Sequence, residues 1–123
     1  MMHRLTLCLV IALSSLAAPR PAAAAATDVY DTVDSVEVNN SDFNFGSAPA
    51  TVVVVGILAG GTTPSSRTYN FGNNNSVPGA VDTAMHCQRL AVVAMSKPGK
   101  FQFAIGPGPG VTAHGCKLIL RAP

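Results

Sequence analysis

The sequence predicts a small α+β domain, in which an antiparallel sheet of four or five strands has one helix packed across it. Three observations lead to this prediction. Residues 51–58 are a run of mostly β-branched residues, which is typical of a strand. Residues 76–97 have helical periodicity, and two further strand-like runs follow them. Cys87 and Cys116 lie in these later segments, where one disulfide could close the unit.

The first 26 residues have the pattern of an export signal. Arg4 gives a basic start, residues 5–16 are an apolar run, and residues 22–24 are alanines that suit a signal peptidase. The run is shorter than the roughly 20 residues that a membrane-spanning helix needs. We therefore expect residues 1–26 to be a cleaved signal peptide, and residues 27–123 to be one domain, periplasmic or secreted, without a membrane span. A retained N-terminal anchor is the alternative.

Charge in the domain is balanced but segregated. Six of the eight basic residues and all six acidic residues follow the leader, so the net charge is near zero and nothing favours nucleic acid as a partner. Five acids fall within residues 28–42, whereas every base comes after residue 66. This pattern indicates either an acidic edge that faces a basic one, within the fold or between subunits, or a solvated, mobile N-terminal segment.

The strands are expected as follows. Residues 28–38 alternate loosely and end in a turn at residues 39–42, and residues 67–71 alternate well enough for another strand. Residues 51–58 have β-branched side chains on both parities, which predicts an interior strand with both faces covered. Residues 100–105 and 116–120 form an irregular hairpin around the Gly/Pro turn at residues 106–110.

The helix is expected to begin at a Ser76 cap and to end before Pro98. At 100° per residue, half of its circumference is apolar. The residues on this half are Val81, Ala84, Met85, Cys87, Ala91, Val92, Ala94 and Met95. Leu90 and Val93 fall on the polar half, so we expect them to be exposed or covered by a partner.

Cys87 and Cys116 are the only cysteines after the leader, and an exported protein meets an oxidising environment. A disulfide across the intervening segment would stabilise the fold by roughly 3–4 kcal/mol, which matters for so small a core.

The sequence disfavours a zinc site and a catalytic site. His86, Cys87, His114 and Cys116 have zinc-binding side chains, but His86 and Cys87 are consecutive and point about 100° apart on a helix. Serine, histidine and aspartate residues are present, but without a nucleophile-elbow motif. We therefore expect no metal, no cofactor and no catalysis.

The sequence favours a non-catalytic exported protein that binds a glycan, a peptide or another protein, with a homo-oligomer through Leu90 and Val93 as one form that it could take. One alternative is an exported enzyme inhibitor that presents residues 60–67, with Arg67 as its anchor. A small hydrolase or a zinc-binding protein is the remaining alternative.

Overall fold

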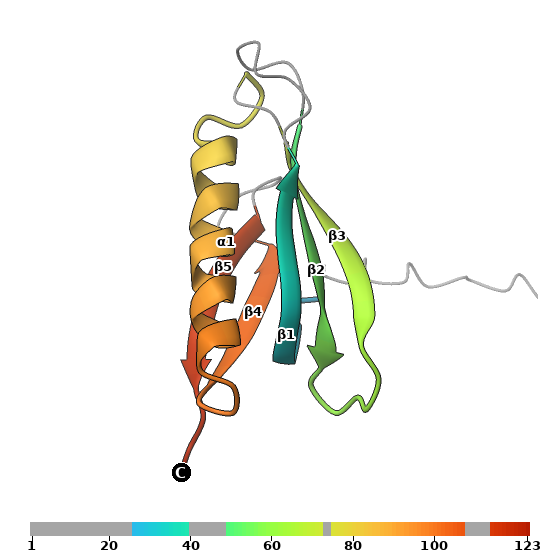
Figure 1. The fold of residues 1–123 in the computed structure, drawn as a ribbon. Helices are drawn as coiled ribbons and strands as arrows, with labels where there is room; N and C mark the ends of the chain where they lie inside the picture. The colour runs from blue at the N-terminus through green and yellow to red at the C-terminus, as the bar shows by residue number, and fades with distance from the viewer. Residues whose placement is uncertain (1–25, 40–48, 73–74, 108–113) are drawn as a thin grey trace, which may run out of the picture.

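A computed structural model of the chain describes residues 26–39, 49–72, 75–107 and 114–123. Its elements are, in order, β1 (Asp28–Asn39), β2 (Ala50–Leu58), β3 (Ser65–Gly72), α1 (Ala80–Ser96), β4 (Phe101–Pro107) and β5 (His114–Leu120). The strands form one antiparallel sheet in the order β3-β2-β1-β4-β5, and α1 packs across it (Figure 1). The predicted fold class is confirmed. The predicted signal peptide lies outside the described residues, except for Ala26.

β1 is paired differently along its two sides. It pairs with β2 from Tyr30 to Asn39, but with β4 only from Asp28 to Tyr30. Its register against β2 shifts twice, once around Asp31 and once around Asp34. Such bulges bend a strand and increase its twist, so β1 turns away from β4 after Tyr30.

Gly56 on β2 permits this bend. A Cβ atom at Gly56 would overlap the carbonyl oxygen of Thr32 and lie 3.0 Å from the Cα atom of Val33. Only glycine lets the bulged backbone of β1 approach β2 so closely.

The bent sheet curls around α1. All five strands contact the helix, and the two edge strands converge at one end. The ring of His114 on β5 lies 5.9 Å from that of Tyr69 and 5.4 Å from that of Phe71, both on β3. The core therefore fills the concave face of the sheet, between the strands and the helix.

Small side chains on α1 let it approach the sheet closely. Its buried residues recur at intervals of four and three, as on one helical face. They are Ala80, Ala84, Cys87, Ala91 and Ala94. The sheet supplies the large side chains, including the fully buried Tyr30, Phe71, Phe103 and Ile105.

This alanine stripe corrects the predicted orientation of the helix. Met85 and Val92, expected on the buried side, are 39% and 51% exposed. Leu90, expected to be exposed, is half-buried and packs against the core, whereas Val93 is exposed as expected. The wide apolar arc was misleading because the fully buried residues of the helix are small, whereas Met85 and Val92 are exposed.

Three other expectations also change. The helix begins at Ala80 behind Gly79, whose φ is 79°, and Ser76 does not form its cap. β2 is interior, as predicted, but Val53 and Val55 on its second face are only half-buried. The acidic segment is not mobile from Asp28 onward, because residues 28–39 form β1.

Candidate functional site

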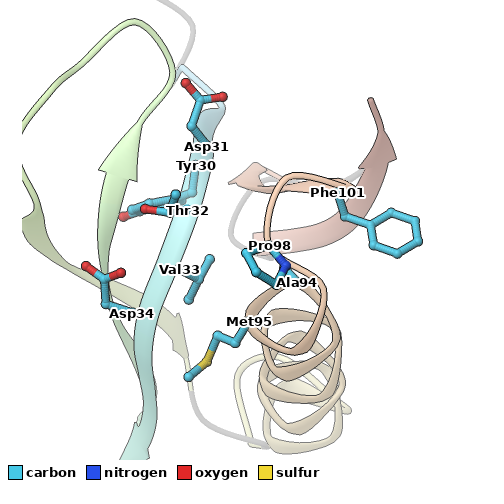
Figure 2. A pocket seen from close by; sticks show the side chains of 9 residues that line it. All are labelled: Tyr30, Asp31, Thr32, Val33, Asp34, Ala94, Met95, Pro98 and Phe101. Carbon is cyan, nitrogen blue, oxygen red and sulfur yellow. The ribbon is translucent and has the colours of Figure 1, made fainter. Parts of the chain in front are cut away.

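A cavity of about 390 Å³ lies where β1 departs from β4. One wall is residues 30–34 of β1, and the other is Ala94, Met95 and Pro98 at the end of α1, with Phe101 at the start of β4. In Figure 2, Val33 and Met95 point toward one another across this groove, while the carboxylate of Asp34 points away from α1. We call this cavity the β1–α1 groove.

The groove runs along an edge of β1. Successive side chains of a strand point to opposite faces, so a cavity lined by five consecutive residues must lie beside the backbone. The β1–β4 ladder ends at Tyr30, and no described strand pairs with this side of residues 32–39. The groove therefore exposes a strand edge in the middle of the sheet order.

Arg121 binds β1 at Asp31, just beyond the end of the β1–β4 ladder. Its Nη2 donates to the carbonyl oxygen of Asp31 at 2.9 Å and to Oδ1 of the same residue at 2.6 Å. Nε2 of Gln102 also donates to Oδ1, at 2.7 Å. The hydrogen bond from Gln102 and the charge of Arg121 lower the pKa of Asp31.

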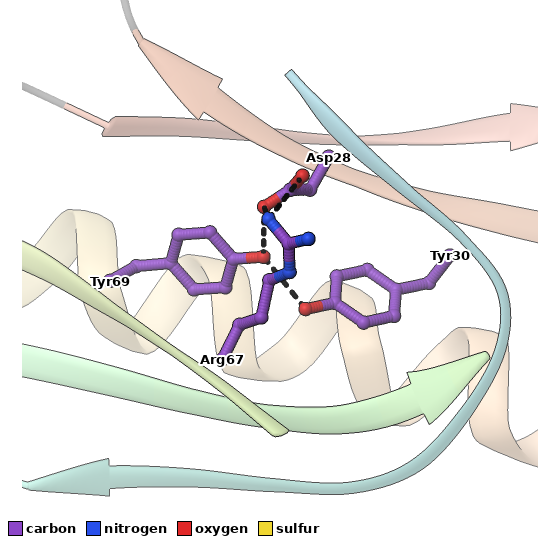
Figure 3. A network of polar contacts seen from close by, with 4 residues as sticks. All are labelled: Asp28, Tyr30, Arg67 and Tyr69. Carbon is purple, nitrogen blue, oxygen red and sulfur yellow. Dashed lines mark hydrogen bonds and ion pairs between the residues drawn. The ribbon is translucent and has the colours of Figure 1, made fainter. Parts of the chain in front are cut away.

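A second polar cluster joins the start of β1 to β3 (Figure 3). Nη1 of Arg67 donates to both carboxylate oxygens of Asp28, at 3.0 and 3.1 Å. The Tyr69 hydroxyl donates to Oδ2 of Asp28 at 2.7 Å, and lies 2.7 Å from the Tyr30 hydroxyl. Because the Tyr69 proton is given to Asp28, Tyr30 must be the donor to Tyr69. We call these four residues the tyrosine network.

The tyrosine network is suited to holding structure rather than to proton transfer. Tyr30 is fully buried and Tyr69 is 8% exposed. Burial raises the pKa of both hydroxyls, and for Tyr69 the hydrogen bonds with Tyr30 and Asp28 raise it further. Both side chains are therefore neutral at physiological pH, and they tie the first residues of β1 to β3.

The two ion pairs confirm that acidic and basic regions meet within the fold. Asp28 pairs with Arg67, and Asp31 pairs with Arg121. Each acid lies in the acid-rich N-terminal segment and each base lies after residue 66, so two of the five acids in this segment pair with bases of the same chain.

The predicted disulfide between Cys87 and Cys116 is present, with a Cα–Cα distance of 5.3 Å. It links α1 to β5. Because the two sulfur atoms are bonded to each other, neither is a thiolate for zinc or for nucleophilic attack. In the part of the chain that the structure describes, no three His, Cys, Asp or Glu side chains are grouped to hold a metal ion.

The predicted partner-surface residues do not form one site. Arg67 lies on β3, where its half-exposed side chain is paired with Asp28, and not at the tip of a loop. Leu90 faces the core, and Val93 shares the outer surface of α1 with Met85 and Val92.

Sequence reasoning missed both the β1–α1 groove and the tyrosine network. One signal for the groove was available, since Asp31 and Asp34 interrupt the alternation of β1. The network had no such signal, because its partners are about 40 residues apart.

Among the described residues, no helix is long and apolar enough to cross a membrane. Comparison with protein-family models, with curated proteins and with solved structures gave no significant match.

Proposed function

We propose that the chain is a small, exported, non-catalytic binding protein whose ligand occupies the β1–α1 groove. The observation that carries this proposal is a cavity that runs along a strand edge for which the described residues supply no strand partner. The disulfide indicates a non-cytoplasmic location, which agrees with the export signal predicted at the N-terminus.

The chemistry of the groove supports binding rather than catalysis. Its charged lining residues are Asp31 and Asp34. Asp31 is held by Gln102 and Arg121, while Asp34 makes no ion pair with any described residue. Tyr30, the remaining ionisable lining residue, has a pKa raised by burial and therefore stays neutral near neutral pH. An acid and a base poised as a pair are not found among these lining side chains.

The alternative of an exported inhibitor anchored by Arg67 has weaker support. An anchor must present its charge to the target, whereas Arg67 donates two hydrogen bonds to Asp28. Binding a target through Arg67 would first require breaking that ion pair.

Filling the groove tests the proposal. Met95→Trp would place an indole in the cavity, and Met85→Trp puts the same side chain on the outer surface of α1 as a matched control. The ¹⁵N–¹H NMR spectrum of each folded protein would be recorded with mixtures of short peptides and of oligosaccharides.

We expect at least one mixture to shift the signals of residues 32–34 and 94–98 in the unaltered protein and in Met85→Trp, but not in Met95→Trp. The proposal is overturned if no mixture shifts these signals, or if Met95→Trp responds as the unaltered protein does.

A further inference from the structure

We infer that the ligand of the β1–α1 groove is a short extended peptide with a basic residue, which pairs through its backbone with β1 at residues 32–34. This inference rests on the proposed function and specifies the class of ligand.

The first argument is that the backbone groups along this edge of β1 need hydrogen-bond partners. β4 pairs with residues 28–30, and Arg121 donates to the carbonyl oxygen of Asp31. From Thr32 onward, the described residues offer this side of β1 no further strand. Backbone N–H and C=O groups require partners, and an extended peptide presents such groups at the spacing of a strand. Adding a strand to an exposed edge is a common mode of peptide recognition.

The second argument is the shape and lining of the groove. Val33 on one side and Ala94 and Met95 on the other make an apolar floor. Residues 31–34 extend over roughly 10 Å at the rise of a strand. A volume of about 390 Å³ is near the lower end for ligand pockets, so the groove suits a few residues with one apolar side chain directed inward.

The third argument is charge. Both charged lining residues are acids, and Arg121 already pairs with Asp31, which leaves Asp34 to attract a cation. From the neighbouring elements, Lys97 follows α1 and Lys100 precedes β4, where its ammonium group lies 5.7 Å from the centre of the Phe101 ring. Because the Asp34 carboxylate points away from α1 (Figure 2), the basic side chain of the ligand is expected to extend past the edge of β1 to reach it, away from these two lysines.

The probe for this inference is the peptide acetyl-Thr-Val-Arg-Val-Thr-amide. Two derivatives accompany it: one with methyl groups on alternate backbone nitrogens, and one with Glu in place of Arg. Each is titrated into the full mature protein, and into Asp34→Asn and its matched control Glu37→Gln. Glu37 is on the same strand but does not line the groove. NMR shifts and amide-exchange rates at residues 32–34 are the readouts.

We expect the parent peptide to shift residues 32–34 and 94–95, and to slow amide exchange on β1. N-methylation should weaken binding about tenfold, since it removes backbone hydrogen bonds. The Glu peptide and the Asp34→Asn variant should each weaken binding about two- to fivefold, as for an exposed ion pair. Glu37→Gln should bind as the unaltered protein does.

Several results overturn the inference and leave the proposed function in place. Equal binding of the N-methylated peptide would mean that side chains alone hold the ligand. Shifts in the groove with oligosaccharides but not with peptides would assign a glycan. If amide exchange on β1 slows with protein concentration alone, and a dimer forms, a second copy of the chain occupies the edge. If neither peptides nor oligosaccharides perturb the groove and the protein stays monomeric, the proposed function fails as well.

Discussion

The two parts of β1 differ in how completely their backbone and side-chain polar groups have partners. At its start, residues 28–30 pair with β4, the backbone carbonyl of Val29 accepts a hydrogen bond from Ala59, and Asp28 and Tyr30 belong to the tyrosine network. Beyond Asp31, the strand has β2 on one side and the β1–α1 groove on the other.

This difference shows how one strand can combine two arrangements of its backbone. The start of β1 is held by polar contacts and by core packing, so it fixes the position of the residues that follow. Two bulges then turn the strand away from β4, which exposes a backbone edge without an additional domain or loop. The following predictions test this division, from the largest expected effect to the smallest.

Removing the disulfide that links α1 to β5 should lower the free energy of unfolding more than any other change proposed here. The helix also forms the second wall of the groove. The double variant Cys87→Ala, Cys116→Ala should lower the free energy of unfolding by roughly 3–4 kcal/mol, from the loss of the constraint on the unfolded chain. Urea denaturation measures this change, and the unaltered protein under reducing conditions is the control. A loss below about 1 kcal/mol would contradict the assigned role of the disulfide.

Gly56→Ala should disturb the bulged part of β1. The added Cβ overlaps the backbone of Thr32, so the strands must separate, at a cost of about 1–3 kcal/mol. Gly99→Ala is the comparison, because its φ of 79° is strained for alanine but no atom lies within 4 Å of the added Cβ. It should cost about 1 kcal/mol and leave NMR signals of β1 unchanged. Unaltered β1 signals in Gly56→Ala would contradict the close approach.

Within the tyrosine network, loss of the buried Tyr69 hydroxyl should lower the free energy of unfolding more than loss of the half-exposed Arg67 cation. Tyr69→Phe leaves the Tyr30 hydroxyl without its acceptor, and should lower the free energy of unfolding by about 1–3 kcal/mol. Arg67→Ala removes a half-exposed ion pair, worth less than about 1 kcal/mol. Thermal or urea unfolding measures both. The reverse ranking would mean that the ion pair, and not the tyrosines, holds β1 to β3.

Asp31 lies at the junction of the two parts of β1. It should make the free energy of unfolding depend on pH in the acid range. Its pKa is lower in the folded protein than its ordinary value of 3.8, so its contribution is complete above that value. The contribution is lost as pH falls below 3.8 through the folded pKa. Asp31→Asn should therefore unfold with a shallower dependence on pH in this range. If the two proteins have identical profiles, Gln102 and Arg121 do not stabilise the ionised carboxylate.

The sequence predicted the elements better than their mutual arrangement. β2 and the end of α1 were placed within about one residue, because a β-branched run and a Pro98-Gly99 stop are local signals. The disulfide followed from having two cysteines after the predicted leader of a chain that we expect to be exported. The start of the helix was misplaced, since Ser76 is a better cap by composition than Gly79, which supplies the left-handed conformation instead.

The orientation of the helix and the groove required information that is not local. Val92 and Met85 are more hydrophobic than alanine, yet the alanines face the sheet because only small side chains allow its concave face to close on α1. The groove depends on where β1 leaves β4, which is decided by the fit of Gly56 to Thr32 and by the reach of Arg121 to Asp31. Neither contact follows from the periodicity of a single segment.

Tyr30 belongs to both parts of the molecule, since it is one of the residues that line the groove and its buried hydroxyl is in the tyrosine network. The chain has no tryptophan and only two tyrosines, so both of its near-ultraviolet phenol chromophores lie in that network. Under the proposed function, a ligand in the groove would lie beside one of them, the buried Tyr30. We therefore expect tyrosine absorbance to report the proposed binding without an attached dye.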